Sequence, residues 1–271
     1  MPGQELSFGE RHEFLIRRLH SLSGLVPVGA FMCVHLAVNA SVLNGAETFQ
    51  NNVYQIHALG KLLPLVEWVT IFLPLIFHAV VGVWIAMGGL PNVGRYEYGA
   101  NWRYLLQRVS GMIALVFILY HVFHMHGWFH AEAWLAMIEP LGGHQFRPYN
   151  APTTAGAALQ NPVIVAFYAL GVVASVFHLA NGLWTMGITW GVWTSPAAQK
   201  KALGACSAFG VGLLVVGLSG LVGMMQVGSG DAFDEARQME DQMYEYRVKA
   251  GSAQPNEHKR VHEAADHTDS H

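Results

Sequence analysis

The chain has 271 residues, of which 52% are hydrophobic and only 12% are charged, and its formal net charge is −3. Soluble domains carry about 25% charged residues, so this composition argues against a soluble globular protein. We therefore predict an integral membrane protein, with no nucleic-acid partner.

Five long stretches with few or no charges predict five membrane-spanning helices, because each can hold the roughly 20 apolar residues that a span needs. Prolines within these stretches are compatible with spans, since membrane helices tolerate proline where the freed carbonyls find other partners. The predicted fold is an all-α bundle over residues 1–228, preceded by a short cytoplasmic segment at residues 1–16. We place its helices at residues 17–44, 64–90, 102–129, 162–191 and 199–228.

Basic residues near the span ends predict the orientation. The first and third connections carry only Lys61 and Arg147, whereas the N-terminal segment and the second and fourth connections are richer in Lys and Arg. The positive-inside rule therefore places the N-terminus in the cytoplasm and the C-terminus outside. The basic residues on the cytoplasmic side are Arg11, Arg17, Arg18, Arg95, Arg103, Arg108, Lys200 and Lys201.

The last segment, residues 229–271, is polar and acidic. We expect a solvated, partly disordered extension, because it lacks the apolar residues that a packed core requires. Its histidines leave metal binding open as an alternative, since His-rich tracts can bind metal ions. They are His258, His262, His267 and His271.

One histidine lies deep within each of the first four predicted helices: His35, His78, His121 and His178. An ionisable side chain at that depth is costly and is a functional candidate by default. The alternative is a neutral histidine that is hydrogen-bonded across the bundle.

The depths of these four histidines form two level pairs. His35 and His121 each follow an arginine at the inner boundary by 18 residues, which places both imidazoles about 27 Å from that boundary. His78 and His178 follow the outer starts of their helices by 14 and 16 residues, which places both about 21 to 24 Å below the outer boundary. Two imidazoles at one depth on facing helices are what a six-coordinate haem requires. We therefore predict two stacked haems b.

A repeated motif supports this prediction. FHAVVGVW at residues 77–84 recurs as FHLANGLW at residues 177–184. Gly82 and Gly182 share a helix face with the preceding histidines, and glycine leaves room there for a porphyrin. We expect the tryptophans that end both motifs to be interface anchors. Gly24 and Gly111, each after a serine, suggest similar close packing, although helix-to-helix contact between small residues explains them equally well.

Five stretches carry a family resemblance: RRLHSLSGLVPVGAFMCVHL, FLPLIFHAVVGVW, NWRYLLQRVSG, LYHVF and VFHLANGLWTMGITWGV. In order, from about Arg17 to Val227, they resemble the succinate dehydrogenase cytochrome b558 subunits, the five-helix, two-haem membrane anchors typified by Bacillus. This family is related to the dihaem anchor of epsilon-proteobacterial fumarate reductase. The resemblance implies that His78 and His178 bind a proximal haem, and that His35 and His121 bind a distal one.

The resemblance also implies partners and a reaction. A cytoplasmic flavoprotein with covalent FAD and an iron–sulfur subunit would dock on the inner face of a bacterial cytoplasmic membrane. Electrons from succinate would pass through the proximal and distal haems to a quinone near the outer side, with menaquinone expected. In such a complex the succinate site lies outside this chain.

Two further sets of residues are candidates for contacts with these ligands. Arg17, His20, Ser21 and Arg108 lie near the inner boundary and could bind haem propionates, although topology marking explains the two arginines as well. A quinone site needs hydrogen bonds and a proton source, for which the candidates near the outer ends are Glu67, His124, His126 and His130. Interfacial solvation is the favoured alternative for these four.

The chain departs from the fumarate reductases at one position. Those proteins carry a glutamate near the fourth-helix ligand for a transmembrane proton path, whereas this chain has Val176 and no acid in that span. The sequence therefore favours the succinate-oxidising form. A quinol:fumarate reductase working in reverse, another dihaem quinone oxidoreductase anchor, and a transporter with a histidine relay remain alternatives.

Overall fold

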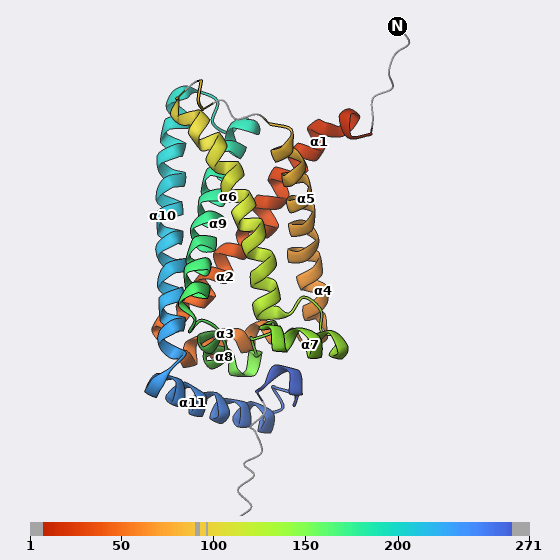
Figure 1. Cartoon of the computed structure of the whole chain (residues 1–271), viewed down its shortest axis with the longest axis vertical. Helices are drawn as coiled ribbons and strands as arrows, with labels where there is room; N and C mark the ends of the chain where they lie inside the picture. Colours follow the sequence, from red (N-terminus) through yellow and green to blue (C-terminus); the bar gives the residue numbers. More distant parts are fainter. Residues whose placement is uncertain (1–7, 90–92, 96, 262–271) are drawn as a thin grey trace, which may run out of the picture. The chain divides into compact units, whose positions relative to one another are not determined.

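The computed structural model describes residues 8–89, 93–95 and 97–261, and their regular elements are all helices (Figure 1). His262, His267 and His271 of the predicted metal-binding alternative lie outside the described residues, as does the side chain of Arg11. The predicted all-α fold is confirmed.

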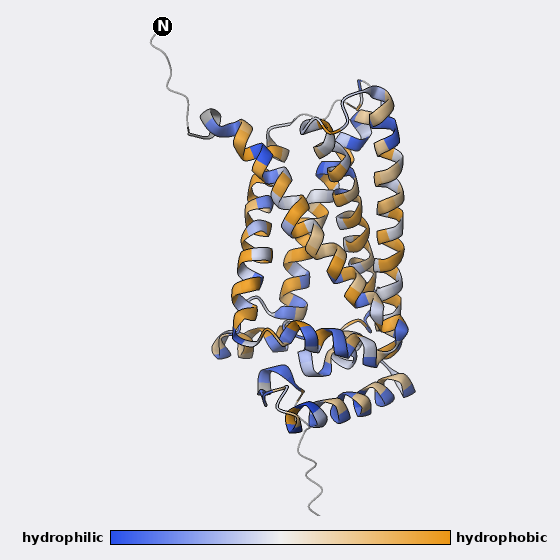
Figure 2. Cartoon of the chain, turned by 180° about the vertical axis from the view of Figure 1, so that it is seen from behind, coloured by the Kyte–Doolittle hydropathy of each residue, from blue (hydrophilic) through white to orange (hydrophobic). Residues whose placement is uncertain are grey.

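Five stretches of helix are long and apolar enough to cross a membrane, and hydrophobic residues follow their length in Figure 2. This confirms the five predicted spans, with ends that differ by no more than five residues from the predicted ones. Apolar side chains such as Val34 and Val80 are exposed on them, as expected where lipid covers the helix surface. The spans are His12–Asn44, Gly60–Met87, Gly99–His126, Pro162–Thr189 and Pro196–Val227.

The first three spans each contain a π-helical turn: η1 (Gly24–Gly29), η4 (Trp68–Phe72) and η5 (Val122–His126). Pro27 lies inside η1, and Pro74 is the second residue of α5 (Leu73–Met87), which follows η4 directly. A π turn lets the helix continue past a proline, because neighbouring donors shift to other carbonyls. At the end of η1, the Ala30 amide bonds to two carbonyls at once.

The chain forms two compact units. The first comprises residues 1–36, 61–118 and 169–218. Within it α1 (Phe8–Ser23) packs on α5, and an apolar core joins Leu36, Val176, Leu179 and Leu213. The helices that contribute to this unit are α1, α2 (Ala30–Ala40), α4 (Leu63–Glu67), α5, α6 (Gly99–His121), α9 (Pro162–Thr189) and α10 (Pro196–Val227).

The second unit comprises residues 37–60, 119–168 and 219–271, and it contains several short helices outside the predicted spans. α11 contacts both α3 and α8 (Figure 1). A second core forms around Tyr54, Tyr149 and Ala253. The helices outside the spans are α3 (Ala46–His57), α7 (Glu132–Ile138), α8 (Ala151–Ala158), α11 (Gly230–Lys249) and the 3-10 turns η6 (Glu139–Leu141), η7 (Pro148–Asn150) and η8 (Glu257–Lys259).

The C-terminal extension differs from the solvated segment that its composition predicts. Glu240 in α11 is fully buried and accepts hydrogen bonds from Asn150 Nδ2 (2.8 Å), Thr153 N (2.9 Å) and Thr153 Oγ1 (2.7 Å). Arg247 lies over the Tyr54 ring at 4.3 Å. The carboxylate thereby satisfies an amide in the first turn of α8, a tertiary contact that no composition average can reveal.

Candidate functional site

His78 faces α1 at close range within the first unit. Its Nδ1–H donates to the backbone oxygen of His20 (2.9 Å), and the two imidazoles stack with centroids 4.1 Å apart. A Cβ on Gly24 would overlap the His78 ring, and a Cβ on Gly82 would lie 3.1 Å from His20 Nε2. Both glycines therefore make room for an imidazole of the facing helix.

His178 makes the corresponding contacts with α6. Its Nδ1–H donates to the backbone oxygen of Gln107 (3.0 Å), and Ser110 Oγ lies 3.4 Å from the same nitrogen. A Cβ on Gly111 would lie 2.8 Å from His178 Cε1, and one on Gly182 would lie 3.4 Å from Gln107 Nε2. The two helix pairs, α1 with α5 and α6 with α9, therefore repeat one pattern of contacts.

The repeat extends to the tryptophans of the two FH motifs. The Arg17 guanidinium lies 5.4 Å from the centre of the Trp84 ring, and Arg103 lies 4.6 Å from that of Trp184. Cation–π contacts of this kind stabilise by about 0.5 to 2 kcal/mol, depending on how desolvated the charge is. These tryptophans, which the sequence predicts as interface anchors, thus also hold the basic residues of neighbouring helices.

His78 and His178 lie beside each other in the first unit. Their ring centroids are 6.0 Å apart, and the rings are nearly perpendicular, at 85°. Because a carbonyl oxygen can only accept, both Nδ1 atoms carry the proton, and both Nε2 atoms keep a lone pair. A backbone partner on one nitrogen is the usual support of a histidine that binds metal through the other. The residues present therefore fit an axial pair for haem iron.

The four candidates for propionate contacts all lie in the first unit, and each has a protein partner. Arg17 Nε donates to Glu13 Oε1 (2.7 Å), and His20 stacks on His78. Ser21 accepts from the Trp190 indole (3.1 Å). Arg108 donates to the Ile85 carbonyl (3.3 Å) and lies over the Tyr104 ring. Their role in binding propionates stays a prediction.

His35 and His121 belong to different compact units, and their pairing stays a prediction. His35 packs on the Phe31 ring, with centroids 5.4 Å apart. His121 Nδ1 lies 3.3 Å from the hydroxyl of Tyr168, which lies 2.8 Å from His124 Nδ1 as well. Tyr168 was missed by the sequence analysis, because an aromatic residue on an apolar helix resembles any core residue.

The quinone candidates do not form one group within either unit. Glu67 lies in α4 of the first unit, whereas the three histidines lie in the second. His124 is only 4% exposed, so interfacial solvation does not describe it. His126 and His130 contact each other, with ring centroids 4.4 Å apart.

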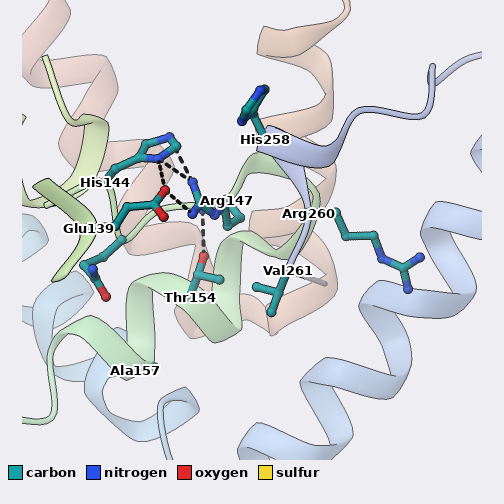
Figure 3. A pocket seen from close by; sticks show the side chains of 9 residues that line it. Glu139, His144, Arg147, Thr154, Ala157, His258, Arg260 and Val261 are labelled. Atoms are coloured by element: carbon teal, nitrogen blue, oxygen red, sulfur yellow. Dashed lines mark hydrogen bonds and ion pairs between the residues drawn. The ribbon is translucent and has the colours of Figure 1, made fainter. Parts of the chain in front are cut away.

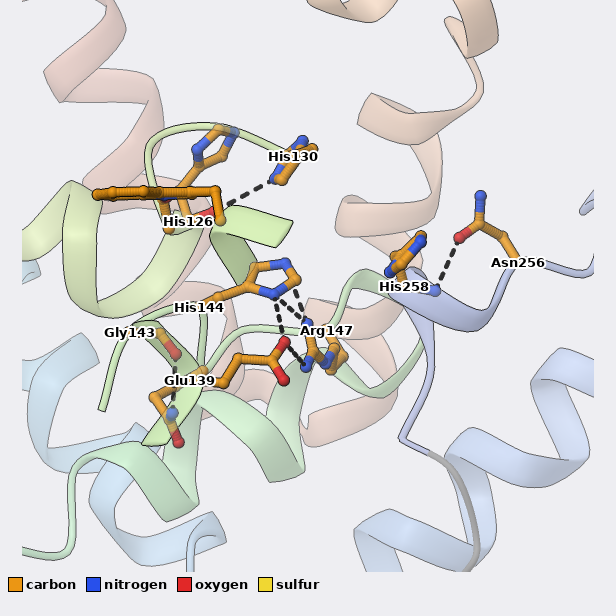
Figure 4. Close-up of polar contacts among 11 residues, drawn as sticks. His126, His130, Glu139, Gly143, His144, Arg147, Asn256 and His258 are labelled. Carbon is orange, nitrogen blue, oxygen red and sulfur yellow. Dashed lines mark hydrogen bonds and ion pairs between the residues drawn. The ribbon is translucent and has the colours of Figure 1, made fainter. Parts of the chain in front are cut away.

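These last two histidines form a histidine cluster with His144, shown in Figure 4. The His130 and His144 centroids are 5.4 Å apart, and Glu139 Oε1 lies 3.0 Å from His144 Nδ1 and 2.8 Å from Arg147 Nη2. His144 is buried and has a φ of +54°, a conformation that a non-glycine residue rarely adopts. Within the part of the chain that the structure describes, no group of three or more His, Cys, Asp or Glu side chains is arranged to hold a metal ion.

A cavity of about 410 Å³ adjoins the cluster in the second unit (Figure 3). The C-terminal extension supplies part of its wall, and Arg147 crosses it towards His144 and Glu139. The cavity is lined by Glu139, His144, Gln145, Arg147, Thr154, Ala157, His258, Arg260 and Val261.

The second unit is expected to lose stability in acid through His57. Burial, together with the nearby Lys259 and His130, lowers the pKa of His57 from 6.5 to about 4. The folded state therefore holds His57 neutral while the unfolded chain takes up a proton below pH 6.5. The contribution of neutral His57 to stability is fully present above pH 6.5 and is lost as the pH drops towards 4. Over this range the equilibrium constant for unfolding rises by at most about tenfold per pH unit.

Amide hydrogen exchange in α3, corrected for the intrinsic effect of pH, measures this loss. Protection should fall between pH 6.5 and 4, and His57→Gln should flatten the fall. His12→Gln, in the first unit, is the control. A His57→Gln profile as steep as that of the wild type would contradict the assignment.

The fold and the paired histidines together define a multi-pass helical membrane protein with imidazoles facing each other inside the bundle. No protein-family model matches the chain. The chain is 38% identical over 209 residues to the succinate dehydrogenase cytochrome b558 subunit of Bacillus subtilis strain 168, a match that covers 77% of this chain and 96% of that protein. The chain therefore belongs to the family of succinate dehydrogenase cytochrome b558 subunits.

Proposed function

We propose that this chain is the dihaem membrane anchor of a succinate:quinone oxidoreductase. It passes electrons from a cytoplasmic flavoprotein and an iron–sulfur subunit, through two haems b, to a membrane quinone, for which we expect menaquinone. The name of the Bacillus subtilis relative supports membership of a succinate dehydrogenase complex and the presence of haem b.

The observation that carries the proposal is the adjacency of His78 and His178, with their ring centroids 6.0 Å apart and each Nδ1 held by a backbone oxygen. A neutral histidine that only bridges helices would share these hydrogen bonds. Gly24 and Gly111, at which an added Cβ would meet the rings of His78 and His178 respectively, make room for the imidazoles in either role. A simple bridge, however, does not require two histidines from different helix pairs to lie side by side. We assign His78 and His178 to the proximal haem and His35 with His121 to the distal haem.

The residues of the chain have defined tasks in this proposal. His78 and His178 each present an Nε2 lone pair, and the backbone bond at Nδ1 fixes the tautomer and raises the basicity of the ligand. Gly24 and Gly111 make room for the rings of His78 and His178 themselves. When bound, haem b supplies one-electron redox chemistry at its iron. Arg17 and Arg108 at the inner ends remain the candidates to neutralise propionate charge.

The proposed orientation has the N-terminus in the cytoplasm and the C-terminal extension outside. Electrons then travel outward, from the negative to the positive side of the membrane, so the resting potential should favour succinate oxidation. Val176, which replaces the acid of the fumarate reductases, lies buried in the apolar core of the first unit beside Leu179. This setting favours the succinate-oxidising direction, because a buried apolar residue cannot carry a proton.

The test is a dithionite-reduced minus oxidised spectrum of the purified chain, with haem quantified per polypeptide. We expect two low-spin b haems in the wild type. His78→Ala and His178→Ala should disturb the same haem, and His35→Ala and His121→Ala should disturb the other. His130→Ala, in the histidine cluster, is the control and should keep both haems. A wild-type chain without haem would contradict the proposal and favour a histidine-relay transporter.

A further inference from the structure

Gln107 occupies the same place in its helix pair as His20 does in the other. The backbone oxygen of each accepts the Nδ1–H of the facing histidine, at 2.9 Å for His20 and 3.0 Å for Gln107. The side chain of each also lies opposite the glycine that follows this histidine by one turn, Gly82 or Gly182. Residues at equivalent places thus differ in type, an imidazole in one pair and an amide in the other.

The side chain of Gln107 adds bonds that tie α6 to α9. Its Nε2 donates to the backbone oxygen of His178 (3.1 Å), and its Oε1 accepts from Asn181 Nδ2 (2.7 Å). The same Nε2 lies 3.5 Å from His178 Nε2. Asn181 is only 7% exposed, so these bonds form away from water, where they are strong and where losing one leaves a polar group unpaired.

These contacts have a consequence for the ligand. The bond from His178 Nδ1 requires the Gln107 carbonyl to stay at one height and one angle relative to α9. The two side-chain bonds set that register, because they join Gln107 to the backbone of His178 and to a residue one turn further on. In the other helix pair, the His20 ring holds the His78 ring by stacking on it, at an interplanar angle of 9°.

We infer that Gln107 is a positioning residue for His178, and that His20 is its counterpart for His78. The inference rests on the proposed role of His78 and His178 as ligands of the inner haem. Gln107 fixes the tautomer and the ring plane of His178, and it keeps the Nδ1 bond that raises the basicity of the ligand. Supporting partners of this kind typically change metal affinity by about 10- to 100-fold when removed.

The experiment measures the transfer of haem from the purified chain to apomyoglobin and the midpoint potential of each haem. Gln107→Ala should speed the loss of one haem by about tenfold or more. It should also raise the potential of that haem, because a less basic ligand stabilises ferric iron less. Asn181→Ala, which removes only the donor to Gln107 Oε1, should act in the same direction and more weakly.

Exchanging the equivalent residues of the two helix pairs tests whether one can replace the other. Gln107→His places the residue of the α1 pair into the α6 pair, and His20→Gln makes the reverse exchange. Both should lose haem more slowly than Gln107→Ala. Gln238→Ala, at an exposed position of α11, is the matched control and should behave as the wild type.

The outcomes separate this inference from the proposed function. A wild type without haem overturns the proposed function. A wild type with two haems, together with Gln107→Ala and Asn181→Ala that keep wild-type haem loss and potentials, overturns the positioning role alone. If Gln107→Ala does not fold, Asn181→Ala and Gln107→His still decide the question.

Discussion

Replacing Gly24 with alanine is expected to abolish binding of the inner haem. A Cβ at this position would overlap the imidazole of His78, and Gly24 begins a π turn beside Pro27, so the backbone has little freedom to withdraw. The ring of His78 must then turn away and release its bond to the His20 carbonyl. Haem per polypeptide should fall from two to one, with the loss confined to the haem that His78→Ala also removes.

Alanine at the other three glycines that face His178, His20 or Gln107 is expected to have graded effects. The nearest atom to an added Cβ lies at 2.8 Å for Gly111, 3.1 Å for Gly82 and 3.4 Å for Gly182. Haem content should follow this order, with Gly111→Ala the most damaging of the three. Gly212→Ala in α10, where an added Cβ meets nothing within 4 Å, is the control and should keep two haems. Equal haem content in the Gly24 and Gly212 variants would contradict the prediction.

Glu240→Ala is expected to release the C-terminal extension from the second unit. The fully buried carboxylate accepts three hydrogen bonds from Asn150 and Thr153, and its removal leaves these donors unpaired. Loss of such bonds should cost about 3 kcal/mol in the free energy of unfolding of this unit. Hydrogen exchange in α8 and α11 measures the loss. Glu240→Gln, which keeps the shape of the side chain, should lose less.

An exposed acid on the same helix provides the comparison for Glu240. Glu245 pairs with Lys249 at 3.5 Å on the solvent side of α11. Its replacement by alanine should cost no more than about 0.5 kcal/mol, because exposed pairs one turn apart contribute little. If both variants left exchange in α8 unchanged, the extension would not stabilise this unit through Glu240.

Hydropathy predicts where the spans begin and end, and residue spacing predicts that His78 and His178 lie together. The five spans were predicted within five residues at each end, and His78 and His178, which depth alone pairs, are neighbours in the first unit. Recurrence in the FH motifs points to Gly82 and Gly182, whereas Gly24 and Gly111 make the closer approach to the imidazoles. Shared helix faces follow from spacing. The rotation of one helix against another does not.

The sequence by itself determined the class of this protein and the number of its spans, because hydrophobic length is a property of one segment at a time. Only the tertiary structure decided that the Gln107 backbone oxygen accepts the Nδ1–H of His178, that Tyr168 lies between His121 and His124, and that Glu240 joins α11 to α8. Each of these contacts joins segments far apart in the chain. Their meeting depends on helix rotation and offset, which the packing of all the segments together sets.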